Sequence, residues 1–186
     1  MLAVAILVVG SALMLALSWR SLRHPRSHGF FRFFVFESLL FLVVVNAGVW
    51  FAQPFAARQV VSWLLLAASA GLAFHGFHLL HVVGRPQAAR PGDPADAANL
   101  PFENTTTLVT CGAYRYIRHP LYASLLLLVW GAALKRLSPA SVALGVAATL
   151  FVVATAKADE RECVERFGDA YRDYIARTRM FIPFLI

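Results

Sequence analysis

Long blocks of apolar residues constrain this chain more than any other feature of its sequence. The hydrocarbon core of a bilayer is about 30 Å thick and needs about 20 residues of helix, at about 1.5 Å each. A water-soluble helix would carry polar residues along one face at a period of 3.6 residues, and these blocks do not. We therefore expect an all-α, polytopic membrane bundle of about five transmembrane helices. The blocks are residues 1–19, 33–52, 60–83, 120–134 and 139–156.

Two of these blocks need comment. Residues 120–134 form a helix of only about 22 Å. This helix therefore begins earlier, relies on Lys135 and Arg136 to reach the membrane surface, or enters the bilayer only partway. The turn at residues 137–139 predicts a tight hairpin with the next block. Residues 1–19 lack the basic start and the small-residue cleavage zone of a signal peptide, so we expect a retained anchor.

The basic residues predict the orientation, because Lys and Arg accumulate in short loops on the cytoplasmic side. With the C-terminus in the cytoplasm, 14 of the 17 Lys and Arg residues fall on that side, and only Arg58, Lys135 and Arg136 fall outside. The N-terminus then lies outside, across what we expect to be a bacterial inner membrane. The net charge of +7 follows from this topology and indicates no nucleic-acid partner. Cys111 and Cys163 fall on the reducing side, so we expect free thiols.

Two polar segments interrupt the apolar pattern on the same predicted side of the membrane. The first, residues 84–119, opens as a Pro-, Gly- and Ala-rich loop and ends in a cluster of aromatic, glycine and cationic residues. His119-Pro120 marks a helix start, since proline suits the first helical position. A helix N-terminus beside Arg118 and His119 would hold a carboxylate or phosphate. The alternative is that Arg115, Arg118 and the nearby tyrosines are ordinary membrane-surface anchors.

The second polar segment, residues 157–179, predicts an amphipathic helix that lies on the membrane or folds back over the first segment. Charged residues lie opposite a stripe of apolar positions at helical spacing. The stripe consists of Cys163, Phe167, Tyr171, Tyr174 and Ile175. Asp159 and Glu160 stand near the end of the fifth block, where the helix dipole disfavours negative charge. They either meet a cationic ligand or form a solvated charge run with local arginine partners.

A series of motifs in fixed order runs through the second half of the chain, roughly residues 103–183. It comprises Thr107-Leu108-Val109, Gly112, Tyr114, Arg118-His119-Pro120, Tyr122, Asp159-Glu160, Phe167-Gly168, Tyr171, Tyr174 and Pro183. In order and spacing this series resembles the isoprenylcysteine carboxyl methyltransferase family and the related phospholipid methyltransferases. The resemblance implies a small helical membrane bundle that binds S-adenosylmethionine at its cytoplasmic end, methylates a lipophilic small-molecule or lipid substrate, and releases S-adenosylhomocysteine. No Rossmann domain is implied, and the chain has no Gly-x-Gly-x-x-Gly after a strand.

The resemblance also assigns site residues. Those that carry over to the cofactor pocket are Thr107, Leu108, Val109, Gly112, Tyr114, Arg118, His119, Pro120, Tyr122, Asp159 and Glu160. The candidates for a catalytic role are Arg118, His119 and Glu160. Residues 84–186 would then form the cofactor-binding part of one membrane-embedded domain. Residues 1–83 would form the substrate side, with Glu37, His81 and Arg85 as candidates for substrate contact, and we expect no metal.

Three positions depart from the family pattern. Asp159 stands where the family usually has Glu, and Ser124 where Gly is frequent. Thr155 lies four residues before the acidic pair, where the eukaryotic isoprenylcysteine enzymes carry an arginine thought to meet the substrate. Prenylated protein C-termini are therefore disfavoured as substrates.

The acceptor and the class of function leave alternatives. A carboxylate or thiolate acceptor needs no base, whereas the amine of phosphatidylethanolamine must first lose a proton. Phospholipid N-methylation is therefore the second hypothesis. A different class starts from His75, His78 and His81, which would bind a metal or haem if a second helix supplied a ligand. A membrane scaffold or transporter without a cofactor is the last alternative.

Overall fold

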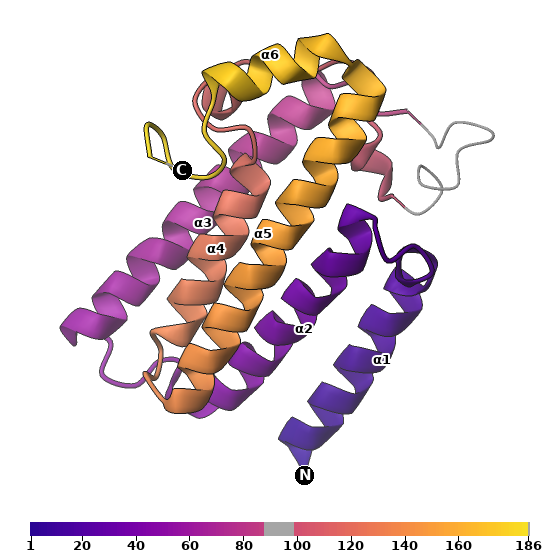
Figure 1. Ribbon diagram of the computed structural model, residues 1–186. Coiled ribbons are helices and arrows are strands. Elements are labelled where there is room, and N and C mark those ends of the chain that lie inside the picture. The colour runs from indigo at the N-terminus through magenta and orange to yellow at the C-terminus, as the bar shows by residue number, and fades with distance from the viewer. Residues whose placement is uncertain (88–98, 186) are drawn as a thin grey trace.

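The computed structural model describes residues 1–87 and 99–185, and the named elements in that part of the chain are all helices. The loop expected between residues 84 and 99 lies mostly outside the described residues. Five long helices run side by side, and a sixth lies across one end of the bundle (Figure 1). They are α1 (Leu2–Leu22), α2 (His28–Asn46), α3 (Ala57–Val82), α4 (Pro120–Ala133), α5 (Pro139–Phe167) and α6 (Asp169–Arg177). Short 3-10 helices are η1 (Ala47–Val49), η3 (Pro101–Glu103) and η4 (Gly112–Arg115).

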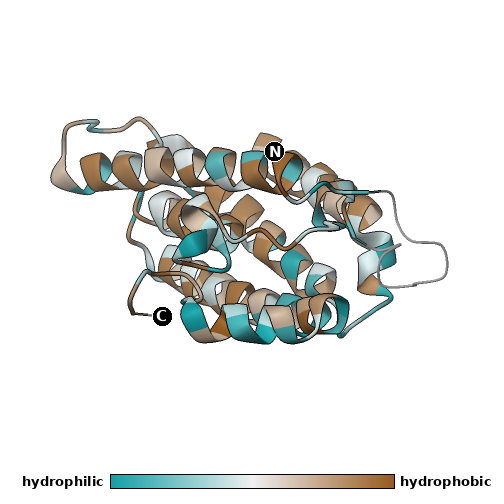
Figure 2. Ribbon diagram, turned by 90° about the horizontal axis from the view of Figure 1, so that it is seen from above, coloured by the Kyte–Doolittle hydropathy of each residue, from teal (hydrophilic) through white to brown (hydrophobic). Residues whose placement is uncertain are grey.

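Four of the helices are long and apolar enough to cross a membrane: α1, α2 continued through η1, α3 and α5. The fifth, α4, is apolar but has only 14 residues. Many large apolar side chains face outward from these helices, as lipid-facing surfaces require, and hydrophobic residues are spread along the long helices in Figure 2. The predicted all-helical polytopic bundle is confirmed.

Proline and serine determine where three of the helices begin. Pro120 and Pro139 occupy the first turns of α4 and α5, so both predicted starts are confirmed. Ser27 and Ser138 cap α2 and α5, because their hydroxyls accept hydrogen bonds from backbone N–H groups that the helix leaves free. The Ser27 cap lets α2 begin at His28, well before residue 33 where the apolar block begins.

Small and hydroxylated residues bring α3 and α4 into close contact. Ser62 donates a hydrogen bond to the carbonyl oxygen of Gly131 (2.6 Å), and Ser69 donates one to that of Ser124 (2.7 Å). Such pairs hold membrane helices together where burial of apolar surface gives little driving force. On the other side, α5 packs against α2, and α1 packs mainly against α2.

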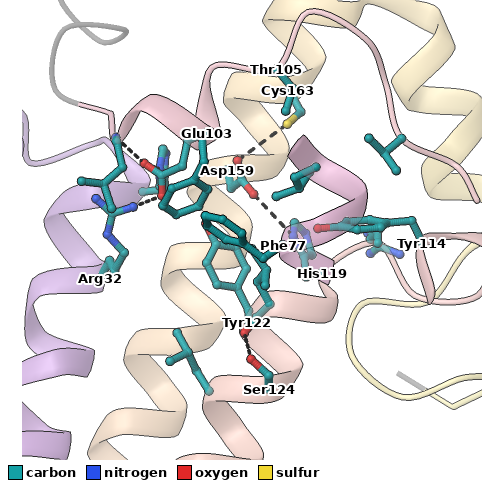
Figure 3. Close-up of a pocket in the computed structure, with 18 of the residues that line it drawn as sticks. Arg32, Phe77, Glu103, Thr105, Tyr114, His119, Tyr122, Ser124, Asp159 and Cys163 are labelled. Carbon is teal, nitrogen blue, oxygen red and sulfur yellow. Dashed lines mark hydrogen bonds and ion pairs between the residues drawn. The ribbon is translucent and has the colours of Figure 1, made fainter. Parts of the chain in front are cut away.

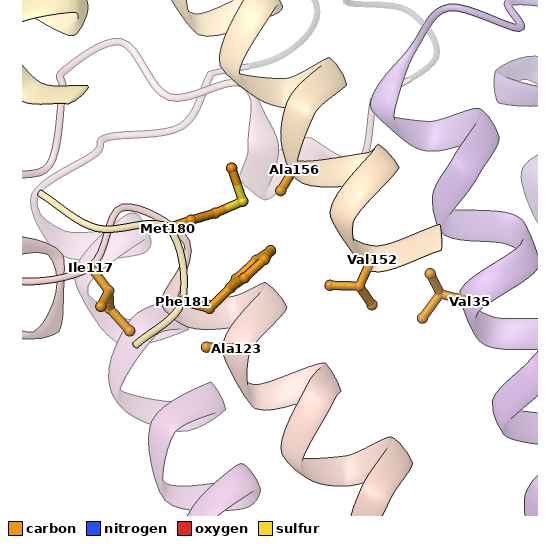
Figure 4. Close-up of a cluster of buried hydrophobic side chains, with 7 residues drawn as sticks. All are labelled: Val35, Ile117, Ala123, Val152, Ala156, Met180 and Phe181. Atoms are coloured by element: carbon orange, nitrogen blue, oxygen red, sulfur yellow. The ribbon is translucent and has the colours of Figure 1, made fainter. Parts of the chain in front are cut away.

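A buried apolar cluster ties the C-terminal segment to the bundle (Figure 4). Met180 and Phe181, which follow α6, pack with Ile117 from the first polar segment, and Val35 and Ala156 continue the cluster toward α2 and α5. The cluster lies directly below the polar end of the bundle, so it supports the segment that precedes α4.

The turn between α4 and α5 forms the expected hairpin, but Lys135 does not reach the membrane surface. Its side chain is fully buried, with Nζ 3.2 Å from the centroid of the Trp63 ring and 5.3 Å from that of Trp50. Nζ also donates a hydrogen bond to Gln59 (3.1 Å). The option in which Lys135 extends to the membrane surface is wrong, because two indole faces and an amide hold the ammonium inside the protein.

The predicted amphipathic C-terminal helix is present as α6, but its predicted bounds, residues 157–179, are wrong. α5 continues through Asp159 and Glu160 to Phe167, and the chain then turns at Gly168 into α6. Gly168 has φ +60° and ψ −133°, a conformation that residues with a Cβ rarely adopt. The apolar stripe is therefore shared between the end of α5 and the start of α6.

Candidate functional site

A cavity of about 280 Å³ lies at the α6 end of the bundle, close to the low end of the range for small-molecule sites (Figure 3). Side chains from α2, α3, the first polar segment, α4, α5 and α6 line it. One part of its wall is apolar, with Phe36, Phe77, Leu80, Leu121 and Leu125. The other part is ionic, with His28, Arg32, Glu103, Arg118, His119 and Asp159.

Most of the residues predicted for the cofactor pocket line this cavity. They are Leu108, Val109, Tyr114, Arg118, His119, Tyr122 and Asp159. The apolar stripe meets it as well, through Cys163, Phe167, Tyr171 and Tyr174. The motifs of the second half of the chain therefore converge on one space, although α4 and most of α5 separate them in sequence.

The other four predicted cofactor residues lie outside the cavity lining. Thr107 is exposed, and its N–H donates to the carbonyl oxygen of Gly84 (3.2 Å). Gly112 borders a neighbouring surface pocket and has φ +58°. Pro120 begins α4 beside the cavity, and Glu160 lies behind Arg118.

The segment before α4 is held by the residues that follow α6. Arg118 donates its backbone N–H to Arg179 O (2.8 Å), and Arg179 donates to Tyr116 O (3.1 Å). The N–H of His119 donates to Met180 O (3.2 Å), so this group at the start of α4 is not free to bind an anion. The Tyr174 hydroxyl donates to the carbonyl oxygen of Tyr114 (2.6 Å) inside the protein.

An ionic network joins the Arg-His motif to the acidic pair. Arg118 Nε donates to Glu160 Oε1 (2.5 Å), and Arg118 Nη1 donates to Thr178 O (2.8 Å). His119 is buried, with Nδ1 3.5 Å from Asp159 Oδ2 and Nε2 3.5 Å from Glu160 Oε1. Glu160 therefore has a local arginine partner, as one of the two hypotheses expected, whereas Asp159 faces the cavity.

The charge state of His119 follows from this network. Burial lowers the pKa of His119, but its interactions with Asp159 and Glu160 outweigh burial and raise the pKa above its ordinary value. This shift favours the protonated imidazole, which carries its positive charge on the cavity wall beside the carboxylate of Asp159.

A second ionic group on the cavity wall was not predicted from the sequence. His28 donates its backbone N–H to Glu162 Oε1 (2.8 Å), and its Nδ1 lies 2.6 Å from Glu162 Oε2. His28 Nε2 lies 3.3 Å from Glu103 Oε2, and Arg32 forms an ion pair with Glu103 (Figure 3). The signal in the sequence was the spacing of four between His28, Arg32 and Phe36, which places all three on one face of α2.

The three candidates for substrate contact do not line the cavity. Glu37 accepts a hydrogen bond from Ser11 on α1 (2.7 Å), and His81 and Arg85 are exposed at the end of α3 and just beyond it. The three histidines of α3 do not gather either: among the described residues they form no group that could hold a metal. His75 instead accepts a hydrogen bond from the N–H of Ala113 (3.2 Å).

Comparison with known families bears directly on this convergence of motifs. Residues 96–170 match a family model described as phospholipid methyltransferase. This part of the chain is therefore similar to the phospholipid methyltransferases. The resemblance to this family and to the related isoprenylcysteine carboxyl methyltransferases is thereby confirmed, and the apolar helices indicate an integral membrane protein.

The curated relatives of the chain are named for action on a small thiol. The methanethiol S-methyltransferase of Pseudomonas deceptionensis is 28% identical over 125 residues, which are 67% of this chain and 43% of that protein. Methanethiol S-methyltransferase 2 of Bradyrhizobium diazoefficiens is 31% identical over 70 residues, which are 38% of this chain and 26% of that protein. The chain thus spans less than half the length of these relatives. No solved structure matches it significantly.

Proposed function

We propose that the chain transfers a methyl group from S-adenosylmethionine to a lipophilic acceptor at the cytoplasmic face of a membrane, and that the preferred acceptor is a small apolar thiol. The observation that carries the proposal is the convergence of the family motifs on one cavity, between an ionic and an apolar wall. The names of the curated relatives support the choice of a thiol.

The residues on the cavity wall fit the methyl donor. S-adenosylmethionine carries a sulfonium and an ammonium group, and Asp159 is an acidic side chain on the wall with no arginine partner among the described residues. The rings of Tyr114, Tyr122 and Tyr171 offer faces to a sulfonium or to adenine. When bound, the donor supplies an electrophilic methyl group.

The protein's own contribution is orientation and exclusion of water. Holding donor and acceptor in the orientation for reaction can lower the barrier by roughly 7 to 11 kcal/mol relative to reactants that meet freely in solution. The apolar wall, with Phe36, Phe77 and Leu125, suits the alkyl part of the acceptor. α2 and α3 contribute much of this wall, so we assign the acceptor to the side formed by residues 1–83.

The orientation of the chain is part of the proposal. Of the 17 Lys and Arg residues, 14 stand in segments that an inward C-terminus places in the cytoplasm. Cys111 is exposed at the α6 end, so it can report the side on which the cavity lies. In a Cys163→Ala background, a membrane-impermeant maleimide should label Cys111 in inside-out vesicles and not in intact spheroplasts. Labelling in spheroplasts would contradict this orientation.

Donor binding tests the proposed activity most directly. We expect the full chain, purified in detergent, to bind S-adenosylhomocysteine in a calorimetric titration. Asp159→Asn keeps the shape of the side chain and removes its charge, so it should weaken binding of the cationic S-adenosylmethionine about tenfold, equivalent to about 1.4 kcal/mol. Asp173→Asn, at an exposed site on α6, is the matched control and should bind like the wild type. Wild-type protein that binds neither compound would refute the proposed function.

The second candidate is phospholipid N-methylation, which the description of the family model favours. Transfer of label from methyl-labelled donor separates the two. Label in the thioether formed from a short alkanethiol supports the thiol, and label only in lipids from phosphatidylethanolamine vesicles supports the phospholipid.

A further inference from the structure

We propose that His28, held by Glu162, is the general base that removes the proton from the thiol acceptor. This inference rests on the function proposed above and adds a residue of α2 to the chemistry. The sequence offered no dedicated base, and neither the family model nor the motif series includes position 28.

His28 is fixed in position before any ligand arrives. It is the first residue of α2, it is 1% exposed, and it lines the cavity. Glu162 holds it at two points, since one carboxylate oxygen accepts from the His28 backbone N–H and the other lies 2.6 Å from Nδ1. A carboxylate on Nδ1 fixes the proton on that nitrogen, so the lone pair of the neutral ring resides on Nε2.

The second ring nitrogen has the freedom that a base requires. Nε2 is buried and makes no hydrogen bond within the described part of the chain. Its neighbouring charged group is Glu103, whose Oε2 lies 3.3 Å away. A proton taken up by Nε2 would therefore face a carboxylate, and the imidazolium would be stabilised between Glu103 and Glu162.

Charged groups from three elements lie around the ring. Glu103 approaches from η3, Glu162 and Asp159 from α5, and Arg32 from the next turn of α2. Asp159 belongs to the same cluster, because one of its carboxylate oxygens lies within 4.8 Å of a ring nitrogen of His28 and of a carboxylate oxygen of Glu162. Three carboxylates and one guanidinium therefore surround the ring, and His119 lies beside Asp159.

The other histidine on the wall, His119, is less suited to this role, because its interactions with Asp159 and Glu160 raise its pKa and favour its protonated form. His28 also stands in the better place, because His28, Arg32 and Phe36 follow one face of α2 over about 12 Å. This face leads from the ionic wall to the apolar wall, so an acceptor with its alkyl part near Phe36 can point its thiol toward His28.

The step balances without any further reactant. The S–H bond of the acceptor breaks, and its proton goes to His28 Nε2 while the electron pair stays on sulfur. That pair forms the new S–CH₃ bond, and the C–S bond of the sulfonium breaks with its electrons remaining on the donor sulfur. The products are a methyl thioether, neutral S-adenosylhomocysteine and imidazolium, which returns its proton to water. A base is useful because a thiol like that of cysteine, with a pKa of about 8.5, is only a few per cent thiolate at pH 7.

A series of thiols of decreasing pKa tests the role of His28. Asn can retain the contact with Glu162 but cannot accept a proton, so His28→Asn should slow methylation of an alkanethiol about 100-fold. The same variant should change methylation of an aromatic thiol, already ionised at the assay pH, by no more than about twofold. His78→Asn, at an exposed site on α3, is the matched control and should leave both rates unchanged. An equal loss for every thiol would overturn the inference and assign His28 a structural role.

Two further measurements separate folding and the proposed function from the role of His28. Glu162→Gln should slow the alkanethiol about tenfold and spare the aromatic thiol, because the imidazolium loses one stabilising charge. With S-adenosylhomocysteine present and no turnover, the ultraviolet thiolate absorption of bound alkanethiol should appear at lower pH in wild type than in His28→Asn. Equal ionisation of the bound alkanethiol in wild type and in His28→Asn would overturn the role of His28 and leave the proposed function intact. Wild-type protein that methylates no thiol would overturn the proposed function together with it.

Discussion

Replacement of Glu160 by alanine should destabilise the protein strongly, because Glu160 neutralises Arg118, whose side chain is only 10% exposed. Glu160 is 8% exposed, and its carboxylate accepts the 2.5 Å hydrogen bond from Arg118 Nε. Without it, the side chain of Arg118 retains only the hydrogen bond to the carbonyl oxygen of Thr178 among its bonds in the described residues. Removing one partner of a buried ion pair costs about 3–5 kcal/mol, because a charge is left buried without compensation.

This cost converts into a measurable change in unfolding temperature. At about 2–4 °C per kcal/mol for a chain of this size, Glu160→Ala should unfold about 6–20 °C below wild type. Tryptophan fluorescence during heating in detergent measures the difference. Glu160→Gln keeps an acceptor for Arg118, so it should lose about half as much.

The control for this prediction lies on the same helix. Glu165 is exposed, and Glu165→Ala should change stability by less than about 0.5 kcal/mol. A Glu160→Ala protein that unfolds within about 2 °C of wild type would show that Arg118 finds water or another partner, and the argument from buried charge would fail.

Three further predictions use the same unfolding measurement. Gly168→Ala should cost about 1–3 kcal/mol from backbone strain alone, since a Cβ meets nothing there, whereas Gly71→Ala, equally open but helical, should cost nothing. Folding raises the pKa of His119, so a protonated His119 stabilises the folded protein. This stabilisation is complete below about pH 6.5, the pKa of an unfolded histidine, and is lost as the pH rises through the pKa of His119 in the folded protein. Wild type should therefore lose more stability than His119→Asn between about pH 6 and about pH 9. Tyr174→Phe should cost about 1–3 kcal/mol, because the Tyr114 carbonyl loses its buried donor.

The sequence predicted the helices well where local chemistry determines them. Hydrophobic length identified the membrane helices, and Pro120 and Pro139 marked the starts of α4 and α5 because proline suits the first turn of a helix. The ordered motifs also identified most of the residues on one side of the cavity. Tyr114, His119 and Asp159 belong to these motifs, and all three line the cavity.

The errors arose where distant parts of the chain decide the outcome. The extended Lys135 was wrong because Trp50 and Trp63, on other segments, enclose its ammonium group. The predicted bounds of the C-terminal helix were wrong because the apolar stripe runs across the turn at Gly168. The end of α5 and the start of α6 face the same cavity, so the stripe keeps its spacing although the helix is interrupted. His28 and Glu103 were missed because each looks like an ordinary polar residue until α5 brings Glu162 beside them.

The backbone pairing of Tyr116 with Arg179 has a consequence for how the protein matures. During synthesis, the segment before α4 is made before α5, α6 and Arg179, so the cavity is incomplete until Arg179 has been added to the chain. A ligand that requires the finished cavity binds only the folded chain and stabilises it by mass action. S-adenosylhomocysteine should therefore act as a chaperone for this protein, and the yield of folded protein in the membrane should rise with its concentration.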